Sequence, residues 1–163
     1  MKSVNGNGVS IGSCIGNAFV YQNKIDLNAE SKIAFNEAVK KLTSKFQSQI
    51  EDFKNNNRNE EAEVLDAYIL ILKDPEITGQ ITAENQSSVK EIYNIFDSSS
   101  NILASMEDEY FKQRAEDIIS VGKHLINTMQ EKEIKVELKE NSVLVADDLT
   151  PADTSSMNMA NVT

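Results

Sequence analysis

Apolar side chains recur at helical spacing through the middle of the chain. From residue 35 to residue 53 they follow one another at intervals of four, three, four, four and three positions, which predicts one face of a long helix. The members of this stripe are Phe35, Val39, Leu42, Phe46, Ile50 and Phe53. The next segment, 54–60, is KNNNRNE, and its asparagines favour turns. We therefore expect a hairpin loop there, followed by a second helix at about 60–73.

Helix signals continue beyond that second helix. Asp74-Pro75-Glu76 predicts a helix restart, because Asp74 can cap free amides and Pro75 occupies the first turn, where its missing N–H costs nothing. A third helix is expected to begin near Ser87 or Ser88. The segment DSSSN at 97–101 is rich in weak helix formers and predicts a break in this helix.

A fourth helix is predicted at about 108–129. Its apolar stripe alternates at four and three positions and contains Gly122, which permits a close helix crossing. The stripe consists of Phe111, Ala115, Ile118, Gly122, Leu125 and Met129. Breaks at asparagine, proline and serine interrupt the stripes, so a compact four-helix bundle is favoured over one long coiled coil.

Both ends of the chain are predicted to form β-structure. Residues 4–23 mix glycines with short β-type runs at 9–11 and 18–21. The apolar run 143–145 is typical of a strand buried on both faces. Thr150-Pro151-Ala152-Asp153 then predicts a further helix, with Thr150 as its cap, and the final ANVT could begin another strand.

We expect the β elements of the two ends to pair in one sheet. The fold class is then α+β, with a four-helix-bundle subdomain at 28–135 inserted into a small α/β subdomain made of 1–25 and 140–163. At 163 residues the chain is long enough for a core that needs no metal or disulfide.

Composition and charge narrow the classes of function. The longest apolar run is far too short to span a bilayer, and the first residues contain no stretch of signal-peptide length, so a cytoplasmic location is expected. The net charge of −10 disfavours binding to nucleic acid or to an anionic membrane. A basic partner is the natural complement, although acidity also serves simply to keep a protein soluble.

The residues show no complete active site. His124 is the only histidine and lies beside the core stripe without a motif around it, so a structural or solvent role is favoured over phosphoryl acceptance. Cys14 is the only cysteine and is best explained as a bystander thiol. No phosphate loop of the Walker type, metal-ligand spacing or serine-histidine arrangement is present. No metal site is predicted.

The second helix carries the most informative surface. On a helical wheel, one face can pack into the bundle through Leu65, Tyr68, Ile69 and Leu72. The outer side has an apolar spot of Ala67, Leu70 and Ile71, ringed by Glu60, Glu61, Glu63, Asp66 and Asp74. This pattern predicts a docking site for a partner with an apolar centre and a basic rim. The alternative is that another helix of the same chain covers it.

Four segments in order resemble enzyme I, the phosphoenolpyruvate-protein phosphotransferase of bacterial sugar uptake. They are GVSIGSCIGNAFVY, AYILILKDPEI, EDEYFKQRAEDIISVGKHL and SVLVADDLTPADT, and in this order they span nearly the whole chain, from residue 8 to residue 154. The resemblance implies a swivelling α/β subdomain of the phosphohistidine type, incomplete here at its C-terminal end, with a helical subdomain inserted into it. It also implies that this chain supplies the surface that docks the phosphocarrier protein HPr.

The resemblance implies a division of labour in the full-length transferase. A histidine is phosphorylated by phosphoenolpyruvate bound on a separate C-terminal barrel, and its phosphoryl group then passes to HPr. The segment with that histidine is expected after residue 163, so this chain is expected to be a fragment that is inactive alone, monomeric and metal-free. The full-length enzyme is expected to need magnesium and to be a homodimer.

The resemblance also assigns residues. The HPr-contacting positions fall on Glu60, Glu63, Asp66, Ala67, Leu70, Ile71, Asp74, Glu76, Leu103, Phe111 and Arg114. Thr154 matches a residue whose hydroxyl orients the phosphorylated imidazole. Tyr68 departs from the family, which often has histidine there, and alters either the edge of the docking face or the packing beneath it.

Two alternatives remain open at this point. The chain could belong to a related phosphocarrier that serves dihydroxyacetone kinase or nitrogen regulation, with the same fold and a different partner. It could also be a non-catalytic acidic helical scaffold. Such a scaffold would bind no HPr, and charge reversal at Asp66 or Glu63 would have no effect on its function.

Overall fold

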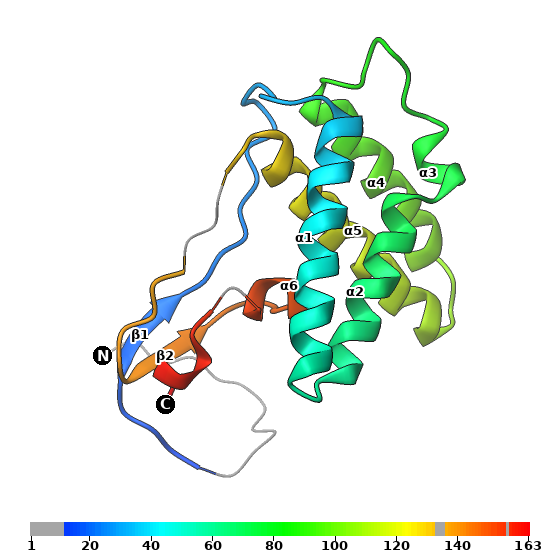
Figure 1. Ribbon diagram of the computed structural model, residues 1–163. Helices are drawn as coiled ribbons and strands as arrows, with labels where there is room; N and C mark the ends of the chain where they lie inside the picture. Colours follow the sequence, from blue (N-terminus) through cyan, green and yellow to red (C-terminus); the bar gives the residue numbers. More distant parts are fainter. Residues whose placement is uncertain (1–11, 133–135, 156) are drawn as a thin grey trace.

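The computed structural model describes residues 12–132, 136–155 and 157–163 (Figure 1). In chain order its elements are β1 (Asn17–Val20), α1 (Phe35–Asn55), α2 (Asn59–Leu72), α3 (Pro75–Thr78), α4 (Val89–Ala104), α5 (Glu109–Met129), β2 (Ser142–Val145), α6 (Pro151–Thr154) and the 3-10 helix η1 (Met159–Asn161). The described part of the chain is therefore mostly helical, with one small sheet. The β-run predicted at 9–11 lies outside the described residues.

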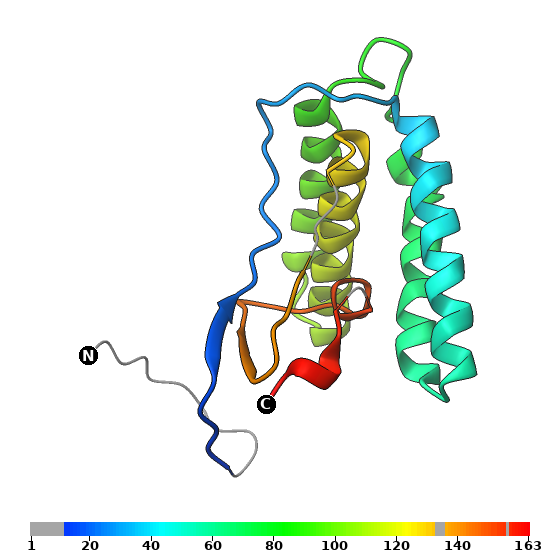
Figure 2. The same cartoon turned by 60° about the vertical axis from the view of Figure 1, so that its left-hand side comes forward.

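Four long helices enclose the main core. α1 packs on α2 and α4 packs on α5, and the two pairs lie side by side in both views (Figures 1 and 2). The predicted stripe of α1 is confirmed, since Phe35, Leu42, Phe46, Ile50 and Phe53 are buried and Val39 is partly buried against them. Burial of such side chains is the main favourable contribution to the fold.

The kink after α2 forms as predicted. Asp74 caps α3, because its carboxylate Oδ1 accepts a hydrogen bond of 2.8 Å from the backbone N–H of Glu76. Pro75 occupies the first turn, where no backbone donor is needed. The chain thereby ends α2 at Leu72 and changes direction without leaving the bundle.

The predicted break in the third helix is wrong, because α4 runs without interruption through 97–101. Two of its serines find partners that offset their weak helix propensity. The Ser99 hydroxyl donates to the carbonyl of Ile95 one turn earlier, at 2.9 Å. The buried Ser100 hydroxyl donates to the carbonyl of Ala115 on α5, at 2.8 Å. A contact between helices thus overrides a local preference.

α4 and α5 cross closely at Gly122, as predicted. A β-carbon built on this residue would lie 3.1 Å from the β-carbon of Phe96, which is fully buried. The lower end of the predicted stripe differs, because Phe111 is 36 % exposed instead of packing in the core. Phe111 lies in the first turn of α5, where its side chain stays partly open to solvent.

The two ends of the chain pair as predicted. β1 and β2 are parallel neighbours, with Asn17 opposite Ser142 and Val20 opposite Val145. Val162, in the final segment, makes a single parallel bridge to Ser142. The prediction that residues 143–145 are buried on both faces is wrong, since Val145 is 47 % exposed. Within the described residues the sheet has two strands, and Val145 is the last residue of β2.

The strands lie beside the bundle, next to its lower end in Figure 1. The subdomain boundaries near residues 25–28 and 135–140 stay a prediction. Within the described residues, every helix is too short or too polar to cross a lipid bilayer.

Candidate functional site

The outer face of α2 is open to solvent. Leu70 is 72 % exposed, and Glu60, Glu63 and Asp66 are exposed around it. Ala67 and Ile71 are partly buried at the edge of the same face. The sequence of α2 contains no lysine or arginine that would neutralise these carboxylates from the same helix. No described helix covers Leu70. For this residue, the alternative that another helix of the same chain covers the apolar spot is therefore wrong.

The remaining acidic positions flank this surface. Asp74 is partly buried because it caps α3, and Glu76 in the first turn of α3 is exposed. Asp66 lies 3.8 Å from the ammonium group of Lys54, and both side chains are 56 % exposed. An exposed pair at this distance contributes little, so the carboxylate of Asp66 can exchange Lys54 for a partner at small cost.

Tyr68 lies beneath the surface formed by α2. It is 2 % exposed, and its ring meets that of Phe46 edge-on, with the centroids 5.9 Å apart. Burial raises the pKa of the Tyr68 hydroxyl, which also interacts with Ser120 of α5. Tyr68 therefore belongs to the packing beneath the outer face of α2 and is not part of the exposed surface.

The other three predicted contact residues lie at the turn between α4 and α5. Leu103 is partly buried and, like Ile71 of α2, packs against the rim of the main core. Phe111 meets the ring of Tyr110 edge-on at 5.5 Å, and the guanidinium of Arg114 lies 5.4 Å from the centroid of the same ring. The structure thus places Phe111 and Arg114 against the ring of Tyr110, and Leu103 against the main core.

Sequence reasoning missed three exposed apolar side chains at this turn. They are Ile102, Met106 and Tyr110, which are 63 %, 38 % and 57 % exposed. No helical pattern marked them, because Ile102 belongs to α4, Tyr110 belongs to α5 and Met106 lies in the turn between the two helices. Among the exposed side chains at this turn, the rings of Tyr110 and Phe111 are neighbours.

Thr154 is the last residue of α6, a short helix held by a capping box. The Thr150 side chain accepts a hydrogen bond from the backbone N–H of Asp153, whose carboxylate in turn accepts from the N–H of Thr150. The Thr154 hydroxyl donates to the carbonyl of Pro151 at 3.3 Å. α6 packs against α2, so Thr154 lies where the small sheet region meets the bundle.

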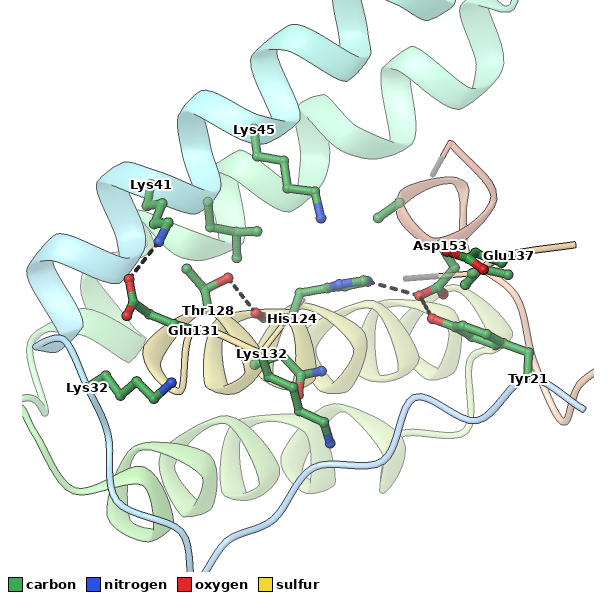
Figure 3. Close-up of a pocket in the computed structure, with 14 residues that line it drawn as sticks. Tyr21, Lys32, Lys41, Lys45, His124, Thr128, Glu131, Lys132, Glu137 and Asp153 are labelled. Atoms are coloured by element: carbon green, nitrogen blue, oxygen red, sulfur yellow. Dashed lines mark hydrogen bonds and ion pairs between the residues drawn. The ribbon is translucent and has the colours of Figure 1, made fainter. Parts of the chain in front are cut away.

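A buried polar cluster joins the bundle to the segments on either side of it. Asp153 Oδ1 accepts a hydrogen bond of 2.5 Å from the Tyr21 hydroxyl and lies 3.6 Å from Nε2 of His124 (Figure 3). All three residues are less than a tenth exposed. Asn23 extends the cluster, because its Oδ1 accepts from Asn127 of α5 at 2.7 Å. Tyr21 and Asp153 are 132 positions apart in sequence, so no local pattern signalled this cluster.

The cluster makes stability depend on pH in a defined direction. Burial lowers the pKa of His124 below its usual value, an effect that Asp153 opposes and that Lys45 and Lys123 reinforce. The unfolded chain therefore takes up a proton at about pH 6.5, where folded His124 stays neutral. The contribution of His124 to the free energy of unfolding is therefore fully present above about pH 6.5 and is lost as the pH falls below it.

We expect the midpoint temperature of thermal unfolding of the native chain to decrease when the pH is lowered from 7.5 to 5.5. The decrease is expected to be smaller in His124→Gln. Glutamine keeps a polar side chain but does not titrate, so the difference between the two slopes isolates His124. Thermal melts followed by circular dichroism at several pH values measure how the unfolding midpoint of each protein depends on pH. Identical slopes in both proteins would contradict the assignment.

The chain belongs to the family described as PEP-utilising enzyme, N-terminal, which its residues 5–114 match. Within that family it corresponds to the N-terminal domain of enzyme I, the phosphoenolpyruvate-protein phosphotransferase.

Several curated relatives carry that name. The phosphoenolpyruvate-protein phosphotransferase of Mycoplasma genitalium is 31 % identical over 173 residues, which cover 97 % of this chain and 30 % of that protein. The Bacillus subtilis protein is 28 % identical, with the same shares covered. The Staphylococcus aureus protein is 33 % identical over 105 residues, 61 % of this chain and 18 % of its own length. The chain thus spans about 30 % of the length of the first of these relatives.

Solved structures show the same fold. A solution structure of an Enzyme I protein has a TM-score of 0.53 at 24 % identity and covers 91 % of this chain and 66 % of its own. The N-terminal domain of a nitrogen-type Enzyme 1 has a TM-score of 0.59 at 17 % identity, and the match covers 90 % of this chain and 66 % of that domain's chain. At these identities the likeness concerns the fold alone.

Proposed function

We propose that this chain is the part of enzyme I that docks HPr, in the first phosphotransfer component of bacterial sugar uptake. The observation that carries the proposal is the outer face of α2, where an exposed leucine stands among carboxylates on a helix without basic residues. An exposed apolar centre with a charged rim has the composition of a protein interface.

The two parts of this surface have different tasks in the proposal. The carboxylates of Glu60, Glu63 and Asp66 attract the basic rim of HPr and speed the encounter, an effect that salt weakens. Leu70 and Ile71 lose contact with water in the complex and hold it together. Leu103, Phe111 and Arg114 extend the contact at the turn between α4 and α5.

Phosphoryl transfer itself belongs to residues outside 1–163 in this proposal. The bundle is inserted into a swivelling α/β subdomain of the phosphohistidine type, and a histidine of that subdomain passes its phosphoryl group to HPr. Thr154 orients that imidazole. His124 is unsuited as the acceptor, because it is 7 % exposed and its Nε2 faces a carboxylate. The chain alone is inactive and monomeric.

The remaining features of the enzyme are assigned to its other parts. Phosphoenolpyruvate and magnesium act through the C-terminal domain, which also forms the homodimer, and the enzyme works in the cytoplasm. The described residues do not fit a magnesium site, since no three His, Cys, Asp or Glu side chains among them are grouped to hold a metal. No step proposed for this chain uses a metal.

The test is an NMR titration of the labelled chain with unphosphorylated HPr from the same organism, at low and at moderate salt. We expect shifts to cluster on residues 66–74 and around Phe111 and Arg114, and the affinity to fall as salt rises. The titration reports docking without requiring an active histidine.

Two other outcomes would contradict the proposal. Binding of a carrier from the dihydroxyacetone kinase or nitrogen-regulatory system, with none of HPr, would assign the chain to that related system. Unchanged spectra of a well-folded sample with every carrier would leave an acidic helical scaffold as the function.

A further inference from the structure

A second site lies on a face of the bundle that the docking surface does not use. A cavity of about 870 Å³ opens between α1, the C-terminal half of α5 and α6, and no residue of α2 lines it (Figure 3). Four lysines line the cavity, namely Lys32, Lys41, Lys45 and Lys132. In a chain with a net charge of −10, this is a local concentration of positive charge.

The carboxylates of the cavity are largely engaged by other groups. Glu131 pairs with Lys41 at 3.1 Å. Asp153 accepts hydrogen bonds from Tyr21 through one oxygen and from Thr150 through the other. Glu137 is the remaining acidic residue of the lining, and it is exposed.

The four lysines differ in the contacts that their ammonium groups make. Lys132 donates to the backbone carbonyl of Lys24 at 2.8 Å, and Lys41 is held by Glu131. Among the contacts of the described residues, Lys32 and Lys45 have no ion pair. Figure 3 shows Lys45 extending from α1 toward the side chain of His124. As far as the described residues are concerned, these two ammonium groups are available to a ligand.

The floor of the cavity contains two buried polar atoms that lack a hydrogen-bond partner within the described part of the chain. They are Nε2 of His124 and Oδ1 of Asn127, on residues that are 7 % and 4 % exposed. The distance of 3.6 Å from Nε2 to Asp153 is too long for a hydrogen bond. Leaving a buried polar atom unpaired costs roughly 1–3 kcal/mol, so native proteins usually provide a water or a ligand.

We propose that this cavity binds a small hydroxylated anion with phosphate or carboxylate groups. The anionic oxygens accept hydrogen bonds from the ammonium group of Lys45, with Lys32 at the rim, and from His124 when its Nε2 carries a proton. A hydroxyl group of the ligand donates to Oδ1 of Asn127. A cavity of about 870 Å³ has room for a molecule of metabolite size, of which one phosphate group fills only a part.

The test is an NMR titration of the labelled full chain at pH 7 with inorganic phosphate and, separately, with citrate. Sodium chloride at matched ionic strength is the reference. We expect saturable shifts at Lys45, His124 and Asn127 and a rise in the pKa of His124 on binding, since an anion favours the imidazolium. Saturation by phosphate alone indicates a phosphorylated ligand, and saturation by citrate alone indicates a carboxylate.

Two variants make the test specific. Lys45→Gln is expected to weaken binding about tenfold or more, because one charge-assisted hydrogen bond is lost. Lys40→Gln removes the same charge from α1 at an exposed position that does not line the cavity, and it is expected to bind as the native chain does. Shifts that match those of sodium chloride, or equal weakening in both variants, would overturn the proposal. The docking of HPr is measured separately and does not depend on this result.

Discussion

Replacing Leu70 by glutamate is expected to weaken HPr binding about ten- to a hundredfold while leaving the thermal unfolding midpoint unchanged. Burying one leucine side chain is worth about 1.5–3 kcal/mol, which corresponds to that range of affinity. Leu70 is 72 % exposed in the free chain, so the fold loses almost nothing when it is replaced. Isothermal titration calorimetry with HPr and a melt by circular dichroism measure the two quantities.

The matched control is Ile15→Glu. Ile15 is 95 % exposed and lies before β1, away from α2, so the same kind of change there is expected to leave HPr affinity as it was. If Leu70→Glu binds HPr as tightly as the native chain, the apolar centre of the docking surface is wrongly placed. Equal weakening in both variants would point instead to a general effect of added negative charge.

Replacing Phe96 by alanine is expected to lower the free energy of unfolding by about 3–5 kcal/mol. Phe96 is fully buried in the core, and its ring fills the close crossing of α4 and α5 against Gly122. Removing the ring leaves a cavity that two rigid helices cannot close. Denaturant unfolding followed by circular dichroism measures the change.

Phe111→Ala makes the same substitution at a phenylalanine that is 36 % exposed on the first turn of α5. Its expected loss of stability is within about 1 kcal/mol, because the site is at the surface and leaves no cavity. A similar loss in the two variants would show that the crossing at Gly122 does not hold the bundle together. Should Phe96→Ala fail to fold, the milder Phe96→Leu is expected to show a smaller loss in the same direction.

Local signals predicted those parts of the structure that depend on nearby residues. The stripe from Phe35 to Phe53 predicted α1, and Asp74 with Pro75 predicted the cap and start of α3. The helical wheel of α2 separated the buried Tyr68 from the exposed Leu70. These predictions succeed because helical periodicity and capping involve side chains within one or two turns of each other.

The failures have a common physical cause. Ser100 does not break α4, because its hydroxyl donates to the carbonyl of Ala115 on another helix. Phe111 follows the periodicity of the core, but in the first turn of α5 its neighbours leave it 36 % exposed. Val145 belongs to an apolar run, yet it is 47 % exposed at the end of β2, which has β1 as its neighbouring strand among the described residues. In each case a neighbour distant in sequence, or the lack of one, decided the outcome.

The sequence by itself determined the helices, the pairing of its two ends, the family and the acidic apolar face of α2, since each rests on periodicity, local capping or an ordered set of motifs. Only the tertiary structure placed Tyr21 and Asp153 within one hydrogen bond of each other, and gathered Lys45, His124 and Asn127 around one cavity. Which side chains share a buried space depends on how helices cross, and packing between distant segments sets that crossing.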